Sequence, residues 1–209
     1  MLATLVAQSP PTAPFDFVEQ AKRLNCSMSD QDCLSQEFAL RRQADQGVRA
    51  ASATDLGCTD ADQECLSAAW HRVDDDNYAR LHDIVTAHGW PPLEGDAARG
   101  AWLIAQHADP DPAGAERRFR DMVLPMIWAE VTAGRLKPVD YARMIDRNAL
   151  SDGKLQPFGS NQPCREGKFD RASIDSVEAV DQRRREIGMD IMLSEEMSFW
   201  DSYCERAAR

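Results

Sequence analysis

One stretch decides the fold class: residues 65–84, which read CLSAAWHRVDDDNYARLHDI. Its core-type side chains recur every three or four residues, at Leu66, Trp70, Val73, Asn77, Leu81 and Ile84. This spacing places them on one face of an α-helix, because a helix completes a turn about every 3.6 residues. We therefore predict an amphipathic helix over residues 62–87, which Gly89 and Pro91-Pro92 bring to an end.

Helix periodicity continues through most of the chain. It predicts further helices at residues 15–23, 30–50, 95–108, 113–133, 138–149, 175–187 and 192–206. Residues 97–105, AARGAWLIA, are apolar on nearly all sides, which is typical of a buried helix, and their small side chains allow neighbouring helices to approach closely. The fold class we predict is all-α, a multi-helix orthogonal bundle with a disulfide-stapled helical repeat at its N-terminal end.

The periodicity stops between residues 150 and 174. Glycine and proline punctuate this segment at Gly153, Pro157, Gly159, Pro163 and Gly167. We expect a long loop or a short β-hairpin inserted into the bundle. Loops of this length in compact domains are often functional.

The chain divides into three regions on composition and pattern. Its 209 residues suit one domain with a small addition, since domains usually hold roughly 100–200 residues. Residues 1–14 are expected to be a signal-peptide remnant or a disordered tail. Residues 15–70 form the cysteine repeat region, and residues 71–209 form the main helical domain.

Four of the six cysteines belong to an internal repeat. The segment LNCSMSDQDCLS at residues 24–35 aligns with LGCTDADQECLS at residues 56–67, 32 positions later, and an aromatic residue follows each copy at Phe38 and Trp70. In one continuous helix, the cysteines of a pair would lie ~10 Å apart. A disulfide needs Cα atoms about 5.5 Å apart. We therefore expect the chain to turn after the first cysteine, with caps at Ser27 or Ser29 and at Thr59 or Asp60, and helices starting near Asp30 and Asp62.

The same reasoning predicts the disulfide pattern. The local pairs are Cys26–Cys33 and Cys58–Cys65, and the remaining pair is Cys164–Cys204. Zinc binding and reduced buried cysteines are the alternatives, but structural zinc sites favour gaps of two to four residues, and the two local pairs have gaps of six. Disulfides imply an oxidising compartment. The apolar start MLATLVAQ resembles the end of a signal peptide, so a periplasmic or secreted location is expected.

Composition excludes several classes of protein. With 43% hydrophobic and 28% charged residues, the chain is typical of a globular protein. The longest uncharged apolar stretch, residues 122–129, is too short to cross a bilayer, so we expect no membrane span. A net charge of −11 without a basic stripe disfavours nucleic acid as a partner.

From His71 onward, the chain resembles an uncharacterised bacterial family known only as a domain of unknown function. The matching elements are Asp76-Asn77 with Leu81 and Ile84, Gly89-Trp90-Pro91, Ala101-Trp102-Leu103, Gln106-His107-Ala108-Asp109, Asp146-Arg147, Gln156 with Phe158-Gly159-Ser160, and Asp181 with Arg184 and Ile187-Gly188-Met189. The family usually has Tyr-Gly-Thr-Gln where this chain has Phe158-Gly159-Ser160-Asn161. The resemblance covers about two thirds of the chain and implies no reaction. Around Cys65 to Tyr78, a weaker similarity to periplasmic lysozyme-inhibitor-like proteins implies a binding role.

His107 is the first candidate site residue, because it closes an otherwise apolar helix together with Gln106. A nearby carboxylate, Asp109 or Asp146, could fix the tautomer of its ring or hold it charged. The functional interpretation is general acid/base catalysis by His107 and Asp109. The alternative, which we favour, is a histidine that ties the helix end to the next loop.

The candidate ligand-binding residues are polar or aromatic groups near the ends of elements. They are Trp90, Gln106, Asp146, Arg147, Gln156, Gly159 and Ser160. We expect Gln106, His107 and Asp109 to meet Asp146, Arg147 and the 156–160 loop in one polar cleft. His71 and Asp75 are spaced for chelation but are better explained as a solvated helix face, so no metal or other cofactor is predicted.

Two functions compete on these observations. The first is a periplasmic or secreted helical binding protein, whose partner is an unidentified protein or cell-wall component, with a basic one favoured by the acidic charge. The second is an enzyme that uses His107 as general acid/base with Asp109, Asp146 and Arg147. The sequence has no nucleophile elbow, phosphate loop or dinucleotide fingerprint.

Overall fold

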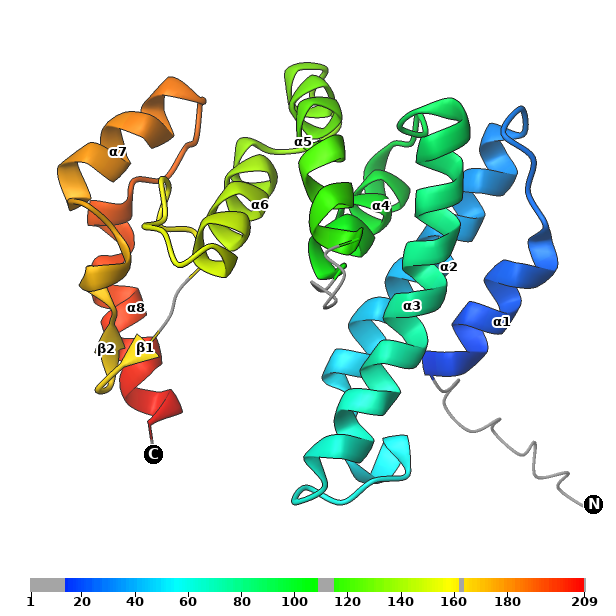
Figure 1. Ribbon diagram of the computed structural model, residues 1–209, viewed down its shortest axis with the longest axis horizontal. Coiled ribbons are helices and arrows are strands. Elements are labelled where there is room, and N and C mark those ends of the chain that lie inside the picture. Colours follow the sequence, from blue (N-terminus) through cyan, green and yellow to red (C-terminus); the bar gives the residue numbers. More distant parts are fainter. Residues whose placement is uncertain (1–13, 109–114, 162–163, 209) are drawn as a thin grey trace, which may run out of the picture. The chain divides into compact units, whose positions relative to one another are not determined.

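The structure, a computed structural model, describes residues 14–108, 115–161 and 164–208. Its elements in chain order are α1 (Pro14–Leu24), α2 (Gln31–Ala50), the 3₁₀ helix η1 (Thr54–Leu56), α3 (Gln63–His88), α4 (Gly95–His107), α5 (Ala115–Thr132), α6 (Pro138–Ser151), β1 (Cys164–Arg165), β2 (Lys168–Phe169), the 3₁₀ helix η2 (Arg171–Ser173), α7 (Val177–Glu186) and α8 (Leu193–Ala207) (Figure 1). The predicted all-α fold is confirmed, and each α-helix begins and ends within about two residues of its predicted bounds. The expected insert is the antiparallel hairpin β1–β2.

The chain forms two compact units, residues 1–107 and 108–209, here named the N-terminal unit and the C-terminal unit. The division expected at residue 70 falls inside α3, whereas the structural division lies between His107 and Ala108. None of the helices in the described parts of the chain is both long enough and apolar enough to span a bilayer.

Helix α2 is the centre of the N-terminal unit, since it packs against α1, α3 and α4. One cluster of its core contains Val18, Ala44, Val48, Ala69 and Val73. Helix α4 is buried along most of its length, as its composition predicts. A Cβ atom added to Gly100 would lie only 2.5 Å from the carbonyl oxygen of Phe38, so the absence of a side chain lets α4 approach α2.

The two copies of the cysteine repeat adopt the same local structure. The Asp30 carboxylate accepts a hydrogen bond from the Cys33 amide at 3.0 Å, and Asp62 accepts one from Cys65 at 3.0 Å. These caps start α2 and α3. They replace the caps expected at Ser27 or Ser29 and at Thr59 or Asp60, because a carboxylate three residues before the cysteine reaches its amide directly. The predicted local disulfides are confirmed, with Cα–Cα distances of 5.5 Å for Cys26–Cys33 and 5.8 Å for Cys58–Cys65.

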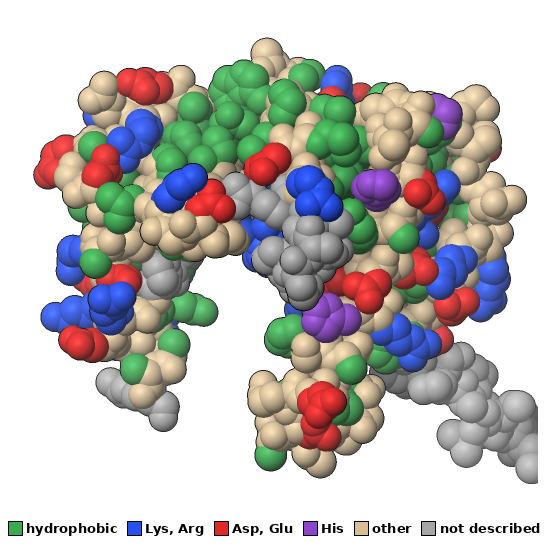
Figure 2. All heavy atoms as spheres, in the orientation of Figure 1, with side chains coloured by type: hydrophobic (Ala, Val, Ile, Leu, Met, Phe, Trp, Pro, Cys, Tyr) green, Lys and Arg blue, Asp and Glu red, His purple; other side chains and the backbone are tan. Residues whose placement is uncertain are grey.

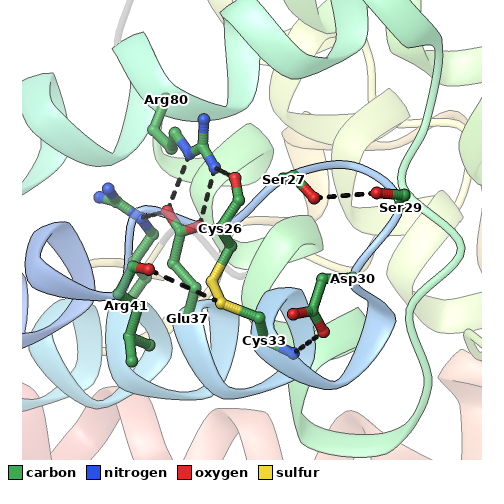
Figure 3. Close-up of a disulfide and its surroundings, with 9 residues drawn as sticks. Cys26, Ser27, Ser29, Asp30, Cys33, Glu37, Arg41 and Arg80 are labelled. Carbon is green, nitrogen blue, oxygen red and sulfur yellow. Dashed lines mark hydrogen bonds and ion pairs between the residues drawn. A yellow bond between two sulfur atoms is a disulfide. The ribbon is translucent and has the colours of Figure 1, made fainter.

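The first of these repeats carries a buried ion-pair network (Figure 3). Glu37 is 2% exposed and accepts hydrogen bonds from Arg41 at 3.0 Å and from Arg80 at 2.8 and 2.9 Å. Arg80 also donates to the Cys26 carbonyl at 3.0 Å, so the network ties the disulfide loop to α2 and α3. The positions equivalent to Glu37 and Arg41 in the second copy are Ala69 and Val73, which belong to the apolar core.

Part of the helical stripe that predicts α3 is exposed. Val73, Asn77, Leu81 and Ile84 are buried as expected, but Trp70 is 44% exposed. Its indole Nε1 donates to the Val48 carbonyl at 3.2 Å, so the ring lies along the edge of α2 rather than in the core.

The C-terminal unit contains the α5–α6 pair and a second group made of the hairpin, α7 and α8. Phe169, Ile174, Val180 and Leu193 form a core cluster that the hairpin, α7 and α8 share. The predicted Cys164–Cys204 disulfide is confirmed, with a Cα–Cα distance of 5.4 Å, and it ties the hairpin to α8. Figure 2 shows hydrophobic side chains gathered over α5 and α6. Trp128 of α5 contacts Tyr141 of α6, with ring centroids 4.9 Å apart.

Candidate functional site

His107 ends α4 and pairs with a buried carboxylate of α2. Its Nδ1 lies 2.7 Å from Oδ1 of Asp45, whose side chain is fully buried. A carboxylate in this position fixes a proton on Nδ1 and leaves Nε2 as the second site of the ring. The partner we expected, Asp109 or Asp146, is thus replaced by Asp45 at this nitrogen.

Asp45 belongs to a larger charge network. Arg49 donates to Asp45 at 3.0 Å and to both oxygens of Asp74 at 3.1 and 2.8 Å. Burial opposes ionisation of Asp45, but the hydrogen bond and charge of His107, together with Arg49, outweigh it and lower the pKa of that carboxyl. Burial prevails at Asp74 and raises its pKa, despite the contact with Arg49. The arrangement can orient His107 as an acid/base group, and it also ties α4 and α3 to α2.

The other N-terminal candidates lie near this network in sequence. Gln106 is 5% exposed, and its Oε1 accepts no hydrogen bond from the part of the chain that the structure describes. Trp90 is half-buried in the connection between α3 and α4. Asp109, the proposed catalytic partner of His107, lies outside the described residues.

Asp146 of α6 anchors the loop that follows this helix. Its carboxylate accepts from the Phe158 amide at 2.8 Å, and from the Ser160 amide and hydroxyl, each at 2.6 Å. Burial raises the pKa of Asp146, and the hydrogen bonds from Ser160 and Phe158 offset only part of this effect. The three bonds hold the backbone of residues 158–160 against α6.

Gln156 and Arg184 complete the anchoring of this loop. The Gln156 side chain is fully buried, donates to the Ser173 hydroxyl at 3.0 Å and accepts from the Asn161 amide at 3.0 Å. Arg184 of α7 donates to the carbonyls of Phe158 at 2.8 Å and Gly159 at 3.1 Å.

The structure therefore brings together one part of the predicted site. Asp146, Gln156, Gly159 and Ser160 lie together in the C-terminal unit, whereas Gln106 and His107 belong to the N-terminal unit. Arg147 is half-buried on α6, and its carbonyl accepts from Ser151 Oγ at 3.0 Å. That the two groups of residues meet in one cleft stays a prediction.

The C-terminal unit contains a pocket of about 370 Å³ beside the anchored loop. Its apolar wall consists of Pro138 and Val139 at the start of α6, Met189 and Ile191 between α7 and α8, and Trp200 of α8. Of the predicted ligand-binding residues, Ser160 is the one that lines it. The volume lies within the range of roughly 300–1,000 Å³ that is usual for small-molecule sites.

Charged groups also line this pocket. Arg184 pairs with Glu196 at 2.7 Å, so these two charges compensate each other. Lys137 and Arg143 have no side-chain partner among the residues that the structure describes, and Asp190 is the remaining acid of the lining. The Trp200 Nε1 atom is buried, and no acceptor for it is found in the described chain.

Sequence reasoning missed Asp45 and most of the pocket. Asp45 follows Ala44 on the apolar face of α2, and a carboxylate on a core-facing position is a signal of a buried partner. No such signal marks Lys137 or Arg143, because lysine and arginine are usually exposed on protein surfaces. Trp200 gives no such signal either. Among the described residues, no group of three acidic, histidine or cysteine side chains is arranged to bind a metal ion.

The chain was compared with family models, curated proteins and solved structures, and none of them matches it. The resemblance to an uncharacterised bacterial family therefore stays an expectation from the motifs.

Proposed function

We propose that the protein is a periplasmic or secreted binding protein whose C-terminal unit takes a small ligand in the pocket beside the 158–160 loop. The observation that carries this proposal is the pocket itself. It has an apolar wall, and among the described residues its indole N–H has no acceptor and two of its cations have no side-chain partner. A few polar groups on an apolar wall are what gives a ligand both affinity and orientation.

The surroundings of the pocket suit a preformed site. Asp146 and Arg184 fix the loop on one side, and the Cys164–Cys204 disulfide ties α8 to the hairpin on another. Rigid walls reduce the entropy that binding would otherwise cost.

The disulfides support the proposed location. All six cysteines are paired, and such bonds persist in the periplasm and outside the cell, where the environment is oxidising. We expect a thiol-trapping reagent applied to intact cells to leave every cysteine unmodified until a reductant is added. Free thiols in the trapped protein would contradict the location.

Ligand binding can be tested by a fragment screen that follows the backbone amide signals of the protein by NMR. We expect some small amphipathic compounds to shift the signals of Val139 and Ile191. The Val139→Trp variant, which fills the cavity, should not respond, whereas Glu178→Trp at an exposed position of α7 should respond like the natural protein. If no fragment separates the two variants, the pocket is not a binding site.

One observation favours a second function, acid/base catalysis by His107. The buried Asp45 carboxylate orients its ring at 2.7 Å, which is the arrangement that prepares a histidine to accept a proton at Nε2. A thiolate nucleophile is excluded, because every cysteine is in a disulfide. A turnover that His107→Gln abolishes and Val139→Trp leaves unchanged would favour this function over the pocket.

A further inference from the structure

The charges in the pocket of the C-terminal unit indicate what it binds. Once the Arg184–Glu196 pair is set aside, the lining keeps two cations, Lys137 and Arg143, against one anion, Asp190. Asp190 is exposed and forms no ion pair with either cation. The unpaired charge of the lining is therefore positive.

The neutral polar groups favour the same kind of ligand. The Trp200 indole can only donate a hydrogen bond, and its buried N–H has no acceptor in the described chain. A buried donor without a partner is costly, so a ligand oxygen that reaches it would remove this cost. Ser160 is no competing donor, since its hydroxyl proton is directed to Asp146.

The net charge of the whole chain does not oppose an anion here. The chain carries −11, but charges farther apart than about 8 Å are largely screened at physiological salt. The side chains that line the pocket therefore decide which ligand charge is favoured, and the acidic groups elsewhere on the surface count for little.

We infer that this pocket binds a small amphipathic carboxylate, with its apolar body against Val139, Met189 and Trp200 and its carboxylate near Lys137 and Arg143. This inference rests on the proposed function. The volume of about 370 Å³ suits a body of about a dozen non-hydrogen atoms, since one water molecule occupies roughly 30 Å³. A free acid and the C-terminus of a peptide ending in an apolar residue share this chemistry.

The test uses three probes with one body and different head groups: 3-phenylpropionate, 3-phenylpropionamide and 3-phenylpropylamine. Their binding to the full chain is followed by NMR through the indole N–H signals of its five tryptophans. The signal that disappears in the Trp200→Phe variant is assigned to Trp200. We expect the carboxylate to shift the Trp200 signal and to bind at least about tenfold more tightly than the amide or the amine, as for a lost charge-assisted contact.

Charge variants and their control then locate the head group. Arg143→Gln and Lys137→Gln should each weaken binding of 3-phenylpropionate about tenfold. Arg185→Gln, which removes an exposed arginine of α7 outside the pocket, should leave it unchanged. Equal weakening in all three variants would overturn the inference, because it would reflect net charge alone.

Failures of the inference and of the proposed function give different results. Preference for the amine or the amide, with the Trp200 signal shifted, overturns the carboxylate assignment and keeps the pocket as a binding site. If none of the probes or screened fragments shifts this signal, both proposals fall. The final probe is a peptide that ends in phenylalanine. If it binds more tightly than 3-phenylpropionate, and amidation of its C-terminus removes this tight binding, the natural ligand is a peptide C-terminus rather than a free acid.

Discussion

The pairing of His107 with Asp45 predicts what the loss of this histidine would do. His107→Ala leaves a buried carboxylate without its closest hydrogen-bond partner, which should cost about 1–3 kcal/mol of unfolding free energy and several degrees of melting temperature. His71→Ala, on an exposed position of α3, should melt like the natural protein.

The pH dependence of this variant gives a second readout. The pKa of Asp45 lies below its ordinary value, so its contribution to stability is present above pH 3.8 and is lost as the pH falls through the lowered pKa. Without His107, burial should raise the pKa of Asp45. Denaturant unfolding at a series of pH values should then show that the variant begins to lose stability at a higher pH than the natural protein. If the stability of the two proteins falls over the same range of low pH, His107 does not stabilise the ionised carboxylate.

An exposed pair between Asp175, which precedes α7, and Arg183 of α7 provides a direct measurement of a lowered pKa. Arg183 donates to both oxygens of Asp175, at 3.0 and 2.6 Å, and lowers the pKa of this carboxyl to about 2. Any stability from the pair is therefore present above pH 3.8 and is lost as the pH falls toward 2. In Arg183→Gln, a carboxyl NMR titration should show the pKa of Asp175 raised toward 3.8 but still below it, because the Ser176 amide keeps its hydrogen bond to this carboxylate. The Arg185→Gln protein should keep the low value.

At the scale of elements, two helix glycines should respond to alanine in opposite directions. Alanine favours a helix over glycine by about 1 kcal/mol, so Gly47→Ala should be neutral or stabilising, because its new Cβ would lie 3.5 Å from Pro14. Gly100→Ala should destabilise by about 1–3 kcal/mol, because its Cβ would overlap the Phe38 carbonyl at 2.5 Å and push α4 away from α2. Thermal unfolding of the two variants measures both signs. A stabilised Gly100→Ala protein would mean that α4 can shift without cost.

At the scale of the whole molecule, the disulfides should contribute according to the chain they enclose. Replacing Cys164 and Cys204 by serine opens a ring with a sequence separation of 40 and should cost about 4 kcal/mol. The same change at Cys58 and Cys65 opens a ring with a separation of 7 and should cost about 2–3 kcal/mol. Denaturant unfolding of the two variants compares them. A larger loss from the short ring would show that native contacts, rather than loop entropy, set these contributions.

Much of the local structure could be predicted from the sequence, because it depends on residues close together in the chain. The stripe at Val73, Asn77 and Leu81 repeats with the period of a helix and indicates which face is buried. The paired cysteines lie seven residues apart, so only a turn before each helix lets them bond.

The tertiary structure alone decided which distant groups meet. His107 pairs with Asp45, 62 residues earlier. The core-facing position of Asp45 on α2 indicates that this carboxylate has a buried partner, but no local pattern identifies His107 as that partner. The pocket likewise combines side chains from Lys137 to Trp200, contributed by α6, the 158–160 loop, α7 and α8. Periodicity specifies the faces that helices bury, but the packing of those faces decides which polar groups are left without partners. Within the described part of the C-terminal unit, these groups include Lys137, Arg143 and the Trp200 indole.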